Sequence, residues 1–281
     1  MVVEEELSLR EIALKLRIYV VNSIFLARSG HPGSSLSCLD ILLYLYKKVL
    51  RVDCNKADLE NRDRFVLSKG HAAPALYAVL AEAGFLNFED LKSLRKFGSF
   101  LQGHPNMNST KGVEMSTGSL GQGISAACGM AAGLKLNNSS ARVYCLLGDG
   151  ELQEGQVFEA LCFACHNKLS NLTFIVDNNG LQIDGSIEEV AGFKNLEEKF
   201  KAFGLEVLNV DGHNFFELEK AFEKVNMIKD KPTIIVAKTI KGKGVSFMEN
   251  KAAWHGKAPN EEEHKIAINE LEQEIKKIKG E

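Results

Sequence analysis

Apolar residues recur at helical spacing near the start of the chain. Leu14, Ile18 and Phe25 fall on one side of a helix with 3.6 residues per turn. Ser8, with Glu11 three residues later, has the spacing of a capping box. The pattern therefore predicts an amphipathic helix that begins at about residue 8 and ends before the glycine-rich segment at residues 29–33.

Further apolar runs and small-residue stretches predict the elements that follow. They are a helix over 37–49, a short buried strand over 64–67, an alanine-rich helix ending at Ala83, a loop over 98–123 rich in Gly, Ser, Asn and Pro, and a helix over 124–136.

The clearest unit lies in the middle of the chain. An apolar run over 141–147 is followed by a helical pattern over 153–168 and a second apolar run over 171–176. This order is typical of a parallel strand–helix–strand crossover. Two more strands are expected over 206–210 and 233–239, with a helix near 215–225 between them. The alternation predicts an α/β fold, a parallel sheet sandwiched by helices with a Rossmann-like topology.

The tail after Pro259 reads as an amphipathic helix over about 260–279. Acidic residues cluster in its first turn and lysines in its last, which matches the helix dipole. No internal repeat or low-complexity linker interrupts the chain. We therefore expect a single domain over residues 1–281, with N-terminal helices over about 8–50.

Composition and charge narrow the class of protein. The 281 residues are 45% hydrophobic and 25% charged, with a net charge of −3. This balance is ordinary for a globular protein and does not suggest a nucleic-acid or membrane surface. The first residues are acidic, unlike a signal peptide, and the apolar stretch at 18–27 is too short to span a bilayer. We expect a cytoplasmic protein with neither nucleic acid nor membrane as partner.

The six cysteines show neither a disulfide framework nor paired zinc-ligand spacing. Cys162 and Cys165 have CxxC spacing but lie inside the predicted crossover helix. We interpret them as packed thiols rather than a redox pair.

Two polar residues follow the two strands of the crossover. Asp149 follows the first and Asn179 the second, thirty positions later. Open parallel sheets bind ligands at this edge, and carboxylate and carboxamide oxygens suit Mg²⁺ or Ca²⁺. Gly148 and Gly150 would let an anion approach the backbone, with the N-terminus of the next helix facing it. The alternative for either segment alone is an ordinary turn, but their joint placement favours a metal and diphosphate site.

Gly148-Asp149-Gly150 followed by Asn179 resembles the metal and cofactor signature of thiamine diphosphate enzymes. In that family the aspartate, the asparagine side chain and a main-chain carbonyl hold the metal. The resemblance therefore implies Asp149, Asn179 and the carbonyl of Leu181 as ligands. It implies the cofactor but not the reaction.

Four of the seven histidines lie in loop-like segments with a neighbouring glycine. An imidazole there can donate to phosphate or move a proton, although any one alone is more often solvent-exposed or already hydrogen-bonded. The four are His31, His71, His104 and His255, whereas His166, His213 and His264 match no catalytic motif and are interpreted as helix or surface residues.

Together these segments resemble the transketolase family from about residue 8 to 260. The motifs occur in family order: Ser29-Gly30-His31-Pro32-Gly33, Asp63-Arg64-Phe65-Val66-Leu67-Ser68 with Gly70-His71-Ala72, Gly118-Ser119-Leu120-Gly121-Gln122-Gly123, and Gly148-Asp149-Gly150 with Leu152-Gln153-Glu154-Gly155. The contexts Gly103-His104-Pro105 and Trp254-His255-Gly256 are ones that the alpha subunit of a 2-oxo acid dehydrogenase lacks. Ser119 stands where many members carry proline.

The resemblance implies a role for each of these segments. His71 and His255 would contact the diphosphate, together with the Gly148-Asp149-Gly150 segment. His31, His104 and His255 would contact the sugar phosphate and handle protons. The main chain of Gly118, Ser119 and Leu120 would meet the aminopyrimidine, and Glu154 and Glu159 would join a carboxylate network at a subunit interface.

The resemblance also implies a partner chain. In the family, a glutamate that activates the cofactor lies in a second, pyrimidine-binding domain, and full-length members are more than twice this long. We therefore expect the N-terminal subunit of a split transketolase, with the pyrimidine-binding and C-terminal domains on a separate chain, assembled as a heterotetramer. Its reaction would transfer a two-carbon ketol unit between sugar phosphates.

Four alternatives stay open at this point. They are the alpha subunit of a 2-oxo acid dehydrogenase, half of a 1-deoxyxylulose-phosphate synthase, a transketolase for an unusual sugar, and a non-catalytic cofactor-binding scaffold.

Overall fold

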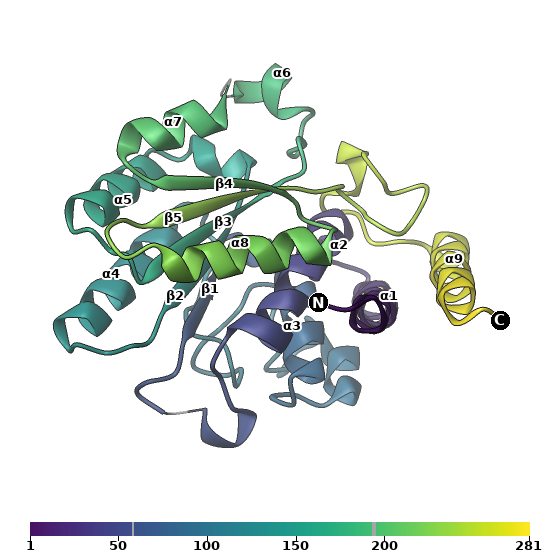
Figure 1. The fold of residues 1–281 in the computed structure, drawn as a ribbon. Helices are drawn as coiled ribbons and strands as arrows, with labels where there is room; N and C mark the ends of the chain where they lie inside the picture. Colours follow the sequence, from purple (N-terminus) through teal and green to yellow (C-terminus); the bar gives the residue numbers. More distant parts are fainter. Residues whose placement is uncertain (58, 193–194) are drawn as a thin grey trace.

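The computed structural model describes residues 1–57, 59–192 and 195–281. Five strands form one sheet in the order β1-β2-β3-β5-β4, and every neighbouring pair is parallel (Figure 1). The strands are β1 (Arg64–Leu67), β2 (Val143–Gly148), β3 (Leu172–Asn178), β4 (Glu206–Asp211) and β5 (Thr233–Lys238). The α/β fold class predicted from the sequence is confirmed, and each strand coincides with a predicted apolar run to within two residues. The single-domain organisation stays a prediction.

Helices cover both faces of the sheet (Figure 1). They are α1 (Val3–Ala27), α2 (Pro32–Tyr44), α3 (Ala73–Glu82), α4 (Gln122–Leu136), α5 (Gly155–His166), α6 (Ile187–Ala191), α7 (Leu196–Phe203), α8 (Phe215–Met227) and α9 (Glu261–Lys279).

Two apolar cores lie on opposite faces of the sheet, because side chains alternate along each strand. In β2, Tyr144 and Leu146 pack into the core formed with α1, α2, α3, α8 and α9. Cys145 and Leu147 pack into the other core, with α4, α5 and α7. Both faces are buried, which explains why the strands read as continuous apolar runs.

The predicted starts of the first two helices are wrong. Helix α1 begins at Val3, so Ser8 lies inside it rather than capping it; Glu4, Glu5 and Glu6 fill the first turn instead, where negative charge is favourable. Helix α2 begins at Pro32, where the sequence predicted residue 37. Proline suits the first helical position because its ring presets φ and the missing N–H needs no partner there.

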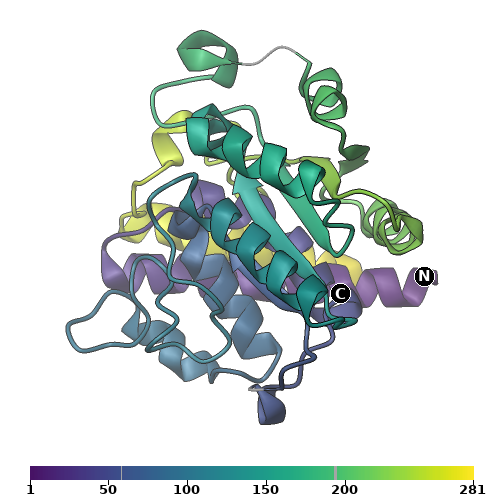
Figure 2. The same ribbon diagram turned by 90° about the vertical axis from the view of Figure 1, so that its left-hand side faces the viewer.

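The C-terminal helix matches its prediction and lies alongside α1 (Figure 2). Within the described ranges, no helix is long and apolar enough to cross a membrane. The segment over 98–121 contains no α-helix or strand, as predicted. It contributes loops to the carboxyl edge of the sheet.

Candidate active site

The carboxyl ends of β2 and β3 bring Asp149 and Asn179 together. The two strands are neighbours, with Gly148 in register with Asp177, so the residues that follow them emerge at the same edge. A cavity of about 230 Å³ opens there. Its lining residues come from segments far apart in the sequence: Ser34, Lys69, His71, Leu120, Gly148, Asp149, Gly150, Glu151, Gln153, Glu154, Asn179, Leu181, Gln182, Ile183, Lys241 and His255.

Asp149 is a buried carboxyl, only 5% exposed. Its Oδ1 accepts a hydrogen bond from the Gly150 N–H (2.9 Å) and its Oδ2 accepts one from the Gly180 N–H (2.6 Å). Burial, and then the charge of Asp177, raise its pKa to about 6. The two backbone donors therefore do not fully compensate the buried charge, and a bound cation would do so.

Two further oxygens belong to the loop that follows β3. Asn179 Oδ1 accepts from the Leu181 N–H (3.1 Å), and the Leu181 carbonyl accepts from Lys241 Nζ (3.3 Å). With Asp149 they form a mixed set of carboxylate, carboxamide and carbonyl oxygens, the type that Mg²⁺ or Ca²⁺ prefers. The described residues hold no cluster of three or more His, Cys, Asp or Glu that could bind a metal ion. A cation here would complete its shell with water and phosphate oxygens, so the residues present fit a metal-bound diphosphate.

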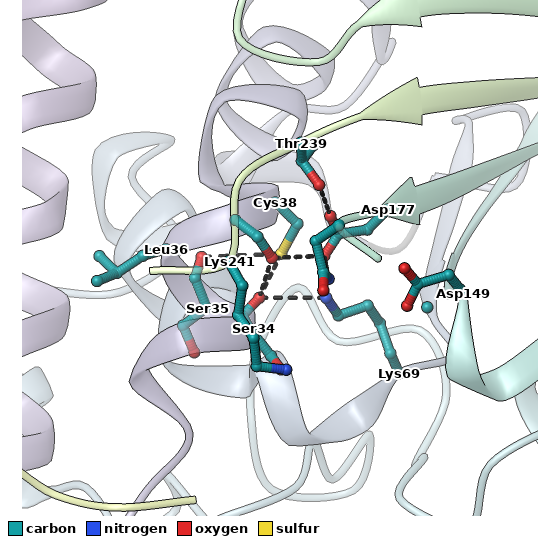
Figure 3. A network of polar contacts seen from close by, with 12 residues as sticks. Ser34, Ser35, Leu36, Cys38, Lys69, Asp149, Asp177, Thr239 and Lys241 are labelled. Atoms are coloured by element: carbon teal, nitrogen blue, oxygen red, sulfur yellow. Dashed lines mark hydrogen bonds and ion pairs between the residues drawn. The ribbon is translucent and has the colours of Figure 1, made fainter. Parts of the chain in front are cut away.

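A buried ion pair between Lys69 and Asp177 lies beside Asp149 (Figure 3). Lys69, which follows β1, pairs with Asp177 of β3 and also donates to the Ser34 carbonyl (3.1 Å). Ser37 Oγ donates to Asp177 Oδ2 (2.5 Å), and Thr239 donates to Oδ1. Burial lowers the pKa of Lys69, but Asp177 outweighs it and keeps the ammonium charged. Sequence reasoning assigned neither residue, although both lie at strand ends on this edge.

Lys241 is a second buried ammonium, only 1% exposed, and sequence reasoning also missed it. No carboxylate of the described chain lies within ion-pair distance of it; it contacts the Leu181 carbonyl and His255 Nδ1 (3.1 Å). Burial, followed by the charge of Lys69, lowers its pKa to about 8. It is therefore still mostly protonated at pH 7. A buried cation that forms no ion pair with a described residue and lines a cavity indicates an anionic ligand.

The four loop histidines predicted from the sequence converge beside this lysine. Ring centroids are 5.1 Å apart for His71 and His255, 5.2 Å for His31 and His71, 5.4 Å for His31 and His255, and 6.4 Å for His31 and His104. His71 and His255 line the cavity, whereas His31 and His104 extend the cluster beyond its lining.

All four imidazoles are neutral at pH 7. Burial is the largest cause, and neighbouring cations add to it: the pKa falls to about 4 for His31, to about 3 for His255, well below the usual value for His71, and below it for His104. A neutral imidazole has one N–H donor and one free acceptor nitrogen. The cluster can therefore both donate to and accept from hydroxyl or carbonyl oxygens.

Glycines allow the loops to approach this closely. Gly118 has a φ of +153°, and a Cβ there would lie 3.0 Å from the His104 ring. A Cβ at Gly70 would lie 2.8 Å from the Gly118 nitrogen. The segment before His71 therefore packs directly against the loop that carries His104, and side chains at these glycines would separate them.

The turn after β2 differs from the prediction. A 3₁₀ turn over Gly150–Gln153 follows Asp149, and α5 begins only at Gly155. The N-terminus of α5 therefore lies two residues later than predicted, and its N-cap residue Glu154 lines the cavity together with residues of the turn. The cause is Glu151, whose buried carboxylate accepts from Gly121 N (2.9 Å), Gly148 N (3.1 Å) and Ser68 Oγ.

The remaining predicted site residues are spread around the cavity. Leu120 and Glu154 line it, and Glu154 is exposed. Ser119 is exposed and Glu159 lies on the exposed side of α5; neither lines the cavity. Their roles toward a cofactor or partner stay predictions.

Two interpretations of side chains away from the cavity are wrong. His213 lies in neither a helix nor an exposed position: its Nε2 accepts from Ile240 N (2.9 Å) and its Nδ1 contacts Asp40 Oδ2 (2.6 Å). Cys162 is exposed rather than packed, because it lies on the outer side of α5, whereas Cys165 is partly buried; both are free thiols. His166 is exposed at the end of α5, and His264 lies in α9.

Buried polar atoms that form no hydrogen bond also support a bound ligand. His31 Nδ1, Gln153 Nε2 and Gln182 Nε2 are buried without a hydrogen-bond partner among the described residues. Both glutamines line the cavity. Buried donors of this kind are costly unless something pairs with them.

One family model and several known proteins match this chain. The family model described as "Transketolase, thiamine diphosphate binding domain" matches residues 8–277. The chain is 39% identical to one subunit of the apulose-4-phosphate transketolase from Phocaeicola vulgatus, covering 95% of each chain. It is 42% identical to the 6-deoxy-6-sulfo-D-fructose transketolase subunit SqwG of a Clostridium species, covering 96% of this chain and 98% of that one.

Longer relatives match over part of their length. Human transketolase is 46% identical over 89% of this chain and 40% of its own. The crystal structure of transketolase from Campylobacter jejuni superimposes with a TM-score of 0.85 at 34% identity, covering 100% of this chain and 48% of that one. The chain thus spans nearly the whole of the two subunit proteins and less than half of these two transketolases.

Proposed function

Because this chain belongs to the transketolase family, within its thiamine diphosphate-binding domain, we propose that it is the N-terminal subunit of a split transketolase. In this proposal it transfers a two-carbon ketol unit from a ketose phosphate to an aldose phosphate. The observation that carries the proposal is the cluster of four neutral histidines beside the unpaired, buried ammonium of Lys241. Such a site suits a ligand with an anionic end and an adjoining set of hydroxyl and carbonyl oxygens.

Each part of the cavity has a task in this proposal. Thiamine diphosphate, when bound, supplies the nucleophilic carbon that attacks the ketose carbonyl and carries the two-carbon unit. Asp149, Asn179 and the carbonyl of Leu181 would hold Mg²⁺ or Ca²⁺. Lys241 and His71 would hold the diphosphate, with the backbone from Gly148 to Gly150 nearby. The main chain from Gly118 to Leu120 would face the aminopyrimidine.

The histidines would then act on the sugar. His31, His104 and His255 would orient the sugar oxygens and move protons at its carbonyl or hydroxyl groups, since each neutral ring offers both a donor and an acceptor. Fixing these oxygens before reaction removes orientational freedom that would otherwise raise the barrier. Glu154, exposed at the mouth of the cavity, would face the partner chain.

The partner would carry the pyrimidine-binding and C-terminal domains. Relatives of nearly the same length are named as subunits, whereas human transketolase is more than twice as long. The proposed assembly is a heterotetramer in the cytoplasm, with the active site shared between two kinds of chain. Membership in the transketolase family argues against the dehydrogenase alpha chain, and the intact set of site side chains argues against a non-catalytic scaffold.

A transketolase for an unusual sugar is the second candidate. Two relatives that match along nearly their full length are named for apulose 4-phosphate and for 6-deoxy-6-sulfo-D-fructose. This argues for testing donors beyond the common ketose phosphates.

Assays with and without the partner test the proposal. The purified chain, Mg²⁺ and thiamine diphosphate are combined with xylulose 5-phosphate and ribose 5-phosphate, alone and with the product of the neighbouring gene. Turnover is expected only with both chains. Turnover by this chain alone would refute the shared site, and activity on pyruvate instead would refute ketol transfer. Activity only on a branched or sulfonated sugar would favour the second candidate.

The metal assignment has its own test. Asp149→Ala should abolish Mg²⁺-dependent binding of thiamine diphosphate and leave the circular dichroism spectrum unchanged. Equal affinity in the variant and the wild type would refute the assignment.

A further inference from the structure

Arg95 occupies an unusual backbone conformation close to the histidine cluster. It follows the 3₁₀ turn over Phe88–Ser93 and has a φ of +58°. Few residues other than glycine adopt this left-handed region. A hydrogen bond from its N–H to the Leu101 carbonyl (2.8 Å) fixes the conformation. This fixed backbone conformation therefore sets the direction in which the Arg95 side chain leaves the backbone.

The guanidinium of Arg95 lies between the two loops that carry His31 and His104. Its Nη1 donates to Ser29 Oγ (3.2 Å), two residues before His31. On the other side it lies against Gly103, where an added Cβ would come within 2.5–2.7 Å of three guanidinium atoms. Gly103 immediately precedes His104, so one side chain braces both loops.

The charge of Arg95 is not neutralised by a carboxylate. It forms no ion pair with any residue in the described ranges, and its Nε is buried without a hydrogen-bond partner. After burial, Arg95 is the largest cause that lowers the pKa of both His31 and His104. After burial, the main causes that lower the pKa of His71 and His255 are instead Lys69, Lys241 and the neighbouring histidines.

Other charged or titratable groups also face His31. They come from three further segments. His104 lies in the loop over 98–121, Lys69 and His71 follow β1, and Lys241 and His255 lie in the segment after β5. All of these are cations or imidazoles. The largest influences on the pKa of His31 all lower it, and Arg95 is the charged group that lowers the pKa of His104.

We propose that Arg95 is a positioning residue for the reaction proposed above. It braces the loops of His31 and His104, and its charge adds to the effect of burial in favouring the neutral imidazoles, which can accept a proton from a sugar hydroxyl. This role rests on the proposed function, but the state of the two histidines can be measured without turnover.

Histidine titration by NMR on the full chain separates this role from mere support. In Arg95→Gln, the titration midpoints of His31 and His104 should rise by about 0.5–1.5 pH units, the size expected when one nearby charge is removed. His71 and His255 should keep their midpoints. Lys96→Gln, which removes an adjacent exposed charge, is the matched control and should move none of the four.

Two further variants separate charge from geometry. Arg95→Lys keeps the charge and should restore the midpoints of His31 and His104. Gly103→Ala keeps the arginine but displaces its guanidinium, so it should raise the midpoint of His104. Gly103 lies outside the left-handed region, so its backbone accepts alanine.

With the partner chain present, the acidic limb of the pH profile of kcat/KM should shift to higher pH in Arg95→Gln. In Arg95→Lys it should return to its wild-type position. Unchanged midpoints in Arg95→Gln would overturn the proposal, as would equal shifts at all four histidines. Shifted midpoints in a chain that shows no ketol transfer with any partner would refute the proposed function and leave the electrostatic role of Arg95 intact.

Discussion

Lys241 Nζ lies 3.1 Å from His255 Nδ1 at the wall of the cavity. An ammonium has donors only, so Nδ1 must accept and the ring proton must sit on Nε2. The lysine thereby fixes the tautomer of the histidine. The pair offers N–H donors from both side chains to a bound anion.

Replacing Lys241 with methionine should weaken anion binding without weakening the fold. A hydrogen bond to a charged group contributes about 1.5–3 kcal/mol, so the affinity for inorganic diphosphate with Mg²⁺ should fall about 10- to 100-fold. The melting temperature should stay equal or rise, because an unpaired buried charge is replaced by an apolar chain of similar size. Calorimetric titration and thermal unfolding check both.

Lys238→Met is the control for this variant. Lys238 is exposed at the end of β5 and does not line the cavity, so its loss should leave the affinity unchanged. A similar loss in both variants would mean that general surface charge, not Lys241, binds the anion.

Mild acid should destabilise the chain. Unfolded histidines bind protons near pH 6.5, whereas His31 and His255 do so near pH 4 and 3 in the folded chain. The unfolded state therefore binds more protons below pH 6.5. The stability present above that pH is lost as the pH falls toward 4, by up to about 1.4 kcal/mol per pH unit for each group. Urea unfolding at pH 7.5, 6.5 and 5.5 measures this.

Comparison with His255→Gln isolates the imidazole contribution. Asp149, with a raised pKa of about 6, acts in the opposite direction, and it is present in both proteins. The variant should lose less stability than the wild type between pH 7.5 and 5.5. Parallel curves for the two proteins would contradict the neutral state of His255.

Arg17→Met should destabilise the chain by about 3–5 kcal/mol, because it leaves Asp40 buried without its main counter-charge. Arg17 donates to both oxygens of Asp40 (2.9 and 2.7 Å), and both side chains are nearly inaccessible. Arg17 Nε also donates to the Lys243 carbonyl (3.0 Å). Chemical denaturation gives the loss, and the double variant Arg17→Met, Asp40→Leu should recover part of it. A loss of stability in the double variant equal to the sum of the losses in the two single variants would contradict this account.

Thiol labelling should distinguish the two cysteines of α5. Cys162 is exposed, whereas burial, followed by the nearby Cys162, raises the pKa of Cys165 to about 11. Because the thiolate is the reactive form, iodoacetamide should modify Cys162 first in the isolated native chain at pH 7.5. Peptide mass spectrometry identifies the site, with Cys162→Ser as control. A Cys162–Cys165 disulfide under reducing conditions would contradict the structure.

The strands and the histidine loops were predictable from the sequence. Strands β2 and β3 are continuous apolar runs because both faces of the sheet are covered, and such runs stand out without any tertiary information. His31 and His104 stand beside glycines in segments with no periodicity. That pattern predicted loops correctly, and parallel topology then brings loops to a common edge.

The buried lysines were not predictable in this way. Lys69 and Lys241 read as surface residues, since lysine is almost never fully buried unless it is paired. The partner of Lys69 is Asp177, 108 positions along the chain. Only the strand order reveals that the two meet. The short helix α7 was missed because it buries little beyond Phe200.

The histidine cluster also has a consequence for how the protein folds. His31 and His255 are separated by most of the chain, yet their ring centroids lie 5.4 Å apart, and His71 lies about as close to each of them. Contacts of such long sequence separation close large loops and form late, and parallel sheets share this delay. Ligand binding at the cluster would therefore report completion of the whole fold, so a diphosphate probe added during refolding should register only the final kinetic phase.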